Sequence, residues 1–218
     1  AAGILALGDA AGTVHLWDMK TSNAITTFAM QKPGELPWPV HELQWSADGR
    51  LLLASSNNVV LWNHVGGTMQ WTTAASSLDN IHAALSPKGD YVALASDNGF
   101  SVLDAGAGAV LWENKAAHDD TVNGVAWLVG DTWPNQDRYG PVLGRVADRI
   151  SGVQRPRDRE RLLLMTWSGD GTTKLWDWRE HAEIMRLAQP AGVIQAAVSR
   201  DGRQILTAGI SESGESTN

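Results

Sequence analysis

The chain has 218 residues, of which 43% are hydrophobic and 19% are charged, and its net charge is −7. This length and apolar share suffice for one β domain with a buried core. The negative charge argues against a nucleic-acid surface as the main face, because such a surface concentrates Lys and Arg. The absence of cysteine excludes disulfides, thiolate nucleophiles and thiolate metal ligands. No apolar run reaches the length of a membrane helix, and we expect a cytoplasmic protein without membrane contact.

Three tight turns along the chain resemble one another. They lie at 46–50, 86–90 and 199–203. Each begins with Ser and has Gly at its fourth position. Gly49 and Gly89 are 40 residues apart, whereas Gly89 and Gly202 are 113 apart, which is two such periods and 33 further residues. A repeat of about 40 residues, with one insertion, is therefore expected.

Each of these turns joins two segments in which apolar and polar residues alternate, the pattern of a half-buried strand. The segments are 40–45 and 51–55, 81–85 and 91–96, and 193–198 and 204–208. A third strand in each unit ends at or near Trp, and a fourth is marked by Trp71 and Trp112, which are 41 residues apart. The sequence therefore predicts an all-β fold built from units of four short strands.

Two of the third strands end in a Trp-Asp pair, Trp17-Asp18 and Trp176-Asp177. Four antiparallel strands in a period of about 40 residues are the pattern of a β-propeller blade. The units resemble WD repeats, whose signature is a Gly-His pair before the first strand and Trp-Asp at the end of the third. The resemblance implies one propeller domain of four-stranded antiparallel blades over residues 1–218. Its repeats are expected at about 1–36, 37–76, 77–116, 117–190 and 191–218, the last of them incomplete.

The resemblance also implies a structural tetrad, in which Trp, a strand hydroxyl, His and a turn Asp are hydrogen-bonded and stiffen a blade. Only the unit from 117 to 190 supplies all four types: His118, Thr166 or Ser168, Asp170 and Trp176. We interpret His118 as part of this set rather than as a metal ligand, because the other His residues are scattered.

The other units lack parts of this set. The third unit has Leu103 in place of Trp, and the first has Ala11 where the Asp would fall. Apolar packing alone is expected to hold those blades.

Tryptophan is abundant, with eleven copies. Seven recur at equivalent repeat positions and are expected to pack in the core: Trp17, Trp62 and Trp176, Trp45 and Trp127, and Trp71 and Trp112. The remaining four, Trp38, Trp133, Trp167 and Trp178, fall outside this register. Trp133 stands beside Pro134 in the insertion and is the best candidate for an exposed contact residue.

The insertion, at 129–160, lies between the first and second strands of its unit and ends in an Arg-rich run. Arg155, Arg157 and Arg159 join Trp133 as candidate partner-binding residues, because guanidinium groups pair well with carboxylate and phosphate. The alternative is a solvated run whose charges pair with the intervening acidic residues.

The sequence contains no Gly-x-Ser-x-Gly elbow, no phosphate-binding loop and no evident nucleophile-base pair, so we predict no catalytic residue, no cofactor and no enzymatic activity. The resemblance implies a scaffold that binds protein partners, or further blades from the same or another chain. The alternative function is a ligand- or nucleic-acid-binding propeller that uses the Arg-rich insertion.

The predicted strands number three at the front, twelve in complete units and two at the back, one more than the sixteen of a closed four-blade ring. This count suggests the propeller region of a larger regulatory or scaffold protein. Alternatively, two copies join into one ring.

Overall fold

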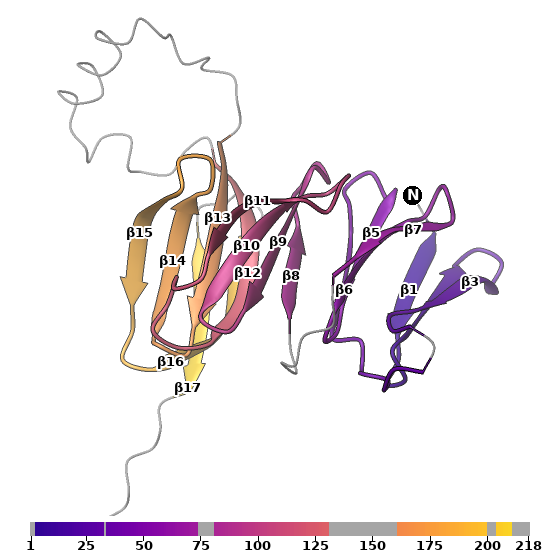
Figure 1. Cartoon of the computed structure of the whole chain (residues 1–218), viewed down its shortest axis with the longest axis horizontal. Coiled ribbons are helices and arrows are strands. Elements are labelled where there is room, and N and C mark those ends of the chain that lie inside the picture. Colours follow the sequence, from indigo (N-terminus) through magenta and orange to yellow (C-terminus); the bar gives the residue numbers. More distant parts are fainter. Residues whose placement is uncertain (1–2, 33, 74–80, 131–160, 200–203, 211–218) are drawn as a thin grey trace, which may run out of the picture.

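The computed structural model describes residues 3–32, 34–73, 81–130, 161–199 and 204–210. Within these ranges the chain forms seventeen β-strands and no helix, and the strands pair in antiparallel fashion. The strands form five sheets, which follow one another in chain order (Figure 1). The predicted all-β fold of four-stranded antiparallel blades is confirmed.

The strands have the following bounds. The first sheet contains β1 (Ile4–Gly8), β2 (Thr13–Asp18) and β3 (Asn23–Ala29). The second contains β4 (Glu42–Trp45), β5 (Leu51–Ser55), β6 (Val59–Asn63) and β7 (Thr68–Thr72). The third contains β8 (His82–Leu85), β9 (Tyr91–Ser96), β10 (Gly99–Asp104) and β11 (Val110–Asn114). The fourth contains β12 (Val122–Gly130), β13 (Arg161–Ser168), β14 (Thr172–Asp177) and β15 (Ala182–Ala188), and the fifth contains β16 (Gly192–Val198) and β17 (Ile205–Ile210).

The Ser that begins the turn makes the same hydrogen bond in two of the repeats. The hydroxyl of Ser46 accepts the N–H of Leu51 at 2.9 Å, and the hydroxyl of Ser86 accepts the N–H of Tyr91 at 2.9 Å. The glycine in the fourth position has φ +77 at Gly89, a left-handed conformation that side chains with a Cβ rarely adopt. The turn chemistry therefore fixes where the first hairpin of a blade reverses direction.

Each pair of neighbouring sheets encloses its own apolar cluster. One buried residue from each side illustrates the four layers: Leu16 with Leu52, Leu61 with Val92, Val102 with Leu164, and Met165 with Val193. Burying one such side chain contributes about 1.5–3 kcal/mol. Each sheet is therefore stabilised mainly by the sheets on either side of it, as expected for stacked repeats.

Side chains bridge the innermost strands of neighbouring sheets. Gln44 of β4 donates to Leu85 O of β8 at 3.2 Å and accepts the Leu85 N–H at 2.8 Å. Trp127 Nε1 of β12 donates to Ala84 O of β8 at 2.9 Å, and Asn123 Nδ2 of β12 donates to Val193 O of β16 at 2.8 Å. These bonds tie separate sheets together where no backbone ladder joins them.

Third-strand tryptophans pack against the preceding sheet. Trp62 stacks on Phe28 of the first sheet with ring centroids 4.4 Å apart, and Trp176 lies 5.1 Å from Phe100 of the third. Trp17 has no preceding sheet among the described residues and is 38% exposed, so its predicted burial is wrong. Trp167 and Trp178 are buried although they lie outside the predicted register.

Polar contacts also occur in the sheets that lack the full tetrad. In the first sheet, Asp9 Oδ2 lies 2.9 Å from His15 Nε2, and Asp9 Oδ1 accepts the N–H of Thr13. Between the second and third sheets, Glu42 Oε1 lies 2.9 Å from His82 Nδ1. The expectation that apolar packing alone holds these blades is therefore wrong, because other acid-histidine pairs are present.

Candidate partner-binding surfaces

Four side chains of the fourth blade form a continuous hydrogen-bonded chain. Trp176 Nε1 donates to Thr166 Oγ1 at 2.9 Å, and His118 Nε2 lies 2.8 Å from the same oxygen. His118 Nδ1 lies 3.0 Å from Asp170 Oδ2. Ser168 instead donates its hydroxyl to Asp120 O, so Thr166 is the strand hydroxyl of the set.

The hydrogen bonds define the protonation of the buried imidazole. Asp170 is an acceptor, so His118 Nδ1 carries the proton and its Nε2 accepts from the Thr166 hydroxyl. Burial, the largest influence, lowers the pKa of His118, and the neighbouring carboxylate of Asp170 opposes this effect without reversing it. The ring is therefore neutral at neutral pH.

Asp170 is held in its ionised form. Burial raises its pKa, but hydrogen bonds from the Thr172 hydroxyl and from the backbone N–H groups of Asp119 and Thr172 outweigh that effect. They lower the pKa of Asp170 from 3.8 to about 2. One carboxylate thus joins the turn before β14, the loop before β12 and the imidazole of His118.

The structure adds Lys174 to this assembly, a residue that the sequence reasoning missed. Lys174 is 5% exposed, and its Nζ donates to Ala117 O and lies 5.8 Å from the Trp176 ring centroid. Lys174 and Trp176 are two positions apart on one strand, so they share a face. That spacing was the available signal, but a lysine in such a strand is normally assigned to the solvent side.

The fourth blade, which contains this hydrogen-bonded set, also contains the insertion predicted at 129–160. The pairing of β12 with β13 continues to Gly130 and Arg161. The predicted contact residues Trp133, Arg155, Arg157 and Arg159 lie outside the described residues.

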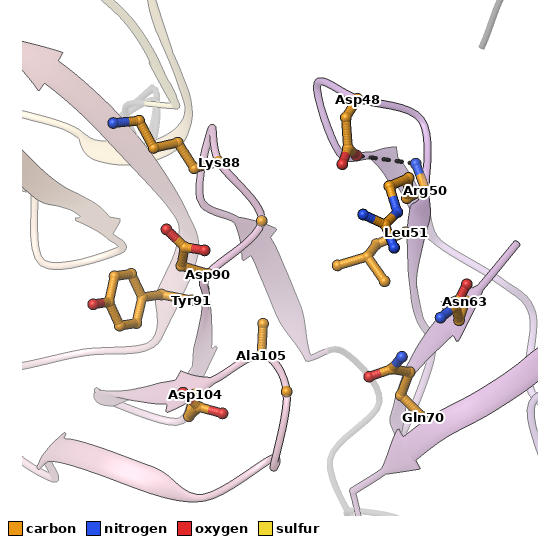
Figure 2. Close-up of a pocket in the computed structure, with 12 residues that line it drawn as sticks. Asp48, Arg50, Leu51, Asn63, Gln70, Lys88, Asp90, Tyr91, Asp104 and Ala105 are labelled. Atoms are coloured by element: carbon orange, nitrogen blue, oxygen red, sulfur yellow. Dashed lines mark hydrogen bonds between the residues drawn. The ribbon is translucent and has the colours of Figure 1, made fainter. Parts of the chain in front are cut away.

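A polar cleft opens between the second and third sheets (Figure 2). Its volume is about 550 Å³. Asp90, Tyr91 and Asp104 line the wall from the third sheet, and Arg50, Asn63 and Gln70 line the wall from the second. No pattern within one repeat marks these residues as a site, because the cleft exists only where two repeats meet.

Both walls of this cleft carry charged and polar side chains. The second sheet contributes Asp48, Arg50, Asn63 and Gln70, and the third contributes Lys88, Asp90 and Asp104, so each wall carries carboxylate and cationic groups (Figure 2). Asn63 Oδ1 already accepts the N–H of Gly66, which leaves its amide N–H groups to donate. Such a surface can bind polar backbone groups through the amides and a cation through the carboxylates.

A second hollow of about 500 Å³ lies along the innermost strands β4, β8 and β12. The half-buried rings of Trp45 and Trp127 line it, together with Leu43 and Pro87. Large aromatic groups of this kind are frequent at protein interfaces.

Among the described residues, no group of three or more His, Asp or Glu side chains is arranged to hold a metal ion. The same part of the chain contains no helix that could cross a bilayer.

Sequence comparison finds two distant relatives. The chain is 26% identical to Meiotic fizzy-related protein 2 of Schizosaccharomyces pombe over 176 residues, which cover 72% of this chain and 33% of that protein. It is 24% identical to Apoptotic protease-activating factor 1 of Danio rerio in an alignment of 262 positions, and this alignment covers 89% of this chain and 20% of that protein. The chain thus spans about a third or less of the length of these relatives. No family model matches the chain.

The sheets, the Trp-Asp strand ends and the two similarities agree with one another. The chain has four-stranded antiparallel sheets that resemble the blades of WD-repeat β-propellers. Such a propeller presents loops and inter-blade clefts on a stack of rigid sheets, and the two hollows described above are surfaces of this kind.

Proposed function

We propose that this propeller is a non-catalytic protein-interaction module, and that the cleft between its second and third sheets holds a segment of a partner protein. The observation that carries the proposal is the polar and charged lining of that cleft. Asp48, Asp90 and Asp104 line this hollow of about 550 Å³ together with the amides of Asn63 and Gln70.

The chemistry of the walls defines the partner segment. Gln70 and the free amide N–H groups of Asn63 suit the carbonyl groups of an extended backbone. Asp90 and Asp104 suit a Lys or Arg side chain of the same segment. An extended peptide with a basic residue is therefore the expected occupant.

Selection from a phage-displayed peptide library against the whole chain tests this proposal. Peptides that carry Lys or Arg should be enriched, and they should lose at least about tenfold in affinity for the Gln70→Ala/Asp90→Asn variant. A matched control, Thr27→Ala/Glu180→Gln, changes exposed residues on the first and fourth sheets and should bind as the wild type does. Equal binding to both variants would place the partner surface elsewhere.

The alternative function, binding of a phosphate-bearing ligand or nucleic acid by the Arg-rich insertion, stays a prediction. It requires that binding of single-stranded RNA weakens steeply with salt and is lost when Arg155, Arg157 and Arg159 are replaced by Ala. The cytoplasmic location is likewise a prediction, which imaging of the tagged protein checks.

A further inference from the structure

The loop that joins the first sheet to the second contains two prolines that alternate with larger side chains. Its central sequence is Leu36-Pro37-Trp38-Pro39, and it connects β3 to β4 without helix or strand. A proline ring fixes its own φ near about −65°, and the residue before a proline is restricted to the β or polyproline II region. Covalent structure alone therefore favours an extended, polyproline II backbone over these four residues.

Hydrogen bonds hold this segment on both sides. Before it, the Lys32 N–H donates to Glu35 Oε2 and the Glu35 N–H donates to Lys32 O, both at 3.1 Å. Within it, Trp38 O accepts the hydroxyl of Ser56 in the second sheet at 3.2 Å. The segment is therefore fixed in place before any partner binds, which reduces the conformational entropy that binding would cost.

The anchored segment presents apolar groups to solvent. Leu36 is 80% exposed, the highest value among the large hydrophobic residues that the structure describes, and Pro37 and Pro39 are exposed as well. A polyproline II helix has about three residues per turn, so Leu36 and Pro39 lie on one side of it. Within the described part of the chain, no group donates a hydrogen bond to the carbonyl oxygens of these three residues. The segment thus offers an apolar edge together with acceptors that a partner can use.

We propose that Leu36, Pro37 and Pro39 are the ligand for a partner domain whose binding groove is lined by aromatic side chains. Grooves of this kind bind proline-rich segments in the polyproline II conformation. The proline rings and Leu36 pack between the aromatic rings, while Tyr hydroxyl or Trp indole N–H groups of the groove donate to the available carbonyls.

This surface is separate from the cleft between the second and third sheets, because none of the residues that line the cleft belongs to the loop. The two proposals also differ in direction. In the cleft this chain binds a segment of a partner, whereas at Leu36 a partner binds a segment of this chain.

A panel of purified polyproline-binding domains of the SH3, WW and EVH1 classes tests the proposal, with binding to the whole chain measured by biolayer interferometry. At least one domain should bind the wild type with a dissociation constant in the range of roughly 1–100 µM. Leu36→Ser removes the most exposed apolar side chain, and Pro37→Ala/Pro39→Ala removes both rings and frees the backbone. Each variant should weaken this binding by at least about tenfold.

Controls separate binding from folding. The replaced residues are exposed, so both variants should keep the far-ultraviolet circular dichroism of the wild type. Leu36→Met keeps a large apolar side chain and should bind as the wild type does. Val65→Ser, which changes a residue that is 71% exposed in the turn between β6 and β7, should also bind normally. Absence of binding to every domain of the panel at roughly 100 µM, or equal binding by the wild type and both loop variants, would overturn the proposal.

Discussion

Trp176 donates the N–H of its indole to Thr166 Oγ1 at 2.9 Å, and the same hydroxyl lies 2.8 Å from His118 Nε2. The hydroxyl of Thr166 is thus the hydrogen-bond partner of two buried rings. In the second sheet Ala54 stands at the position of Thr166, and the buried Nε1 of Trp62 has no hydrogen-bond partner. Among other differences, the second blade therefore lacks the hydroxyl group that accepts the indole N–H in the fourth.

Replacing Thr166 by Val should destabilise the chain. Val keeps the size of the side chain but leaves His118 Nε2 and Trp176 Nε1 without a partner. We expect a loss of about 3 kcal/mol in the free energy of unfolding, because each unpaired buried group costs about 1–3 kcal/mol. Urea denaturation followed by tryptophan fluorescence measures it.

A neighbouring threonine supplies the matched control. Thr173 is fully buried in β14, and its hydroxyl has no hydrogen-bond partner. Thr173→Val should therefore leave the free energy of unfolding unchanged or raise it. Equal losses in the two variants would show that volume or shape, and not the hydrogen bonds of Thr166, sets the stability.

Supplying the missing hydroxyl should stabilise the second blade. Ala54→Ser places an oxygen at the position that Thr166 occupies in the fourth blade, where it can accept the N–H of Trp62. We expect a gain of about 0.5–1.5 kcal/mol in unfolding free energy, the net value of a buried hydrogen bond. A loss of stability would mean that the hydroxyl does not reach the indole. Ala93→Ser, also fully buried but in the third blade, is the control and should not stabilise.

Because Asp170 is ionised in the folded chain, the free energy of unfolding should depend on pH. Its pKa in the folded chain is about 2, below the ordinary 3.8, so its contribution is present above pH about 4 and is lost as the pH falls through 2. The full contribution is roughly 2 kcal/mol. In Asp170→Asn the contribution is absent at all pH values. The stability difference between wild type and this variant should narrow by about 1 kcal/mol between pH 6 and pH 3, as measured by urea denaturation. A constant difference would contradict the assignment.

The carboxylate of Asp170 should also stiffen the hairpin that leads into the insertion. Asp170→Ala removes the bonds to His118 and to the Asp119 N–H. We expect faster amide hydrogen exchange at the far end of β12, at Val129 and Gly130, and through residues 131–160. Asp48→Ala, in a turn of the second sheet, is the control and should leave this exchange unchanged. Unaltered exchange in Asp170→Ala would show that the tetrad does not stabilise the hairpin that leads into the insertion.

The sequence by itself determined the strand number, the repeat and the composition of the tetrad. Short-range patterns carry this information, because alternation marks strands and a Ser-to-Gly turn marks each hairpin at any place in the chain. The roles of His118, Asp170 and Trp176 followed from the resemblance of their unit to WD repeats.

Only the tertiary structure decided which side chains of these strands are buried, exposed or hydrogen-bonded. It selected Thr166 over Ser168, buried Lys174, left Trp17 exposed and opened the cleft beside Gln70. Each of these outcomes depends on which sheet lies next to a given strand, and the sequence of one repeat contains no record of that neighbour. Because burial in a stacked β-sheet protein arises between repeats, residues at equivalent positions can lie in the core in one blade and on the surface in another.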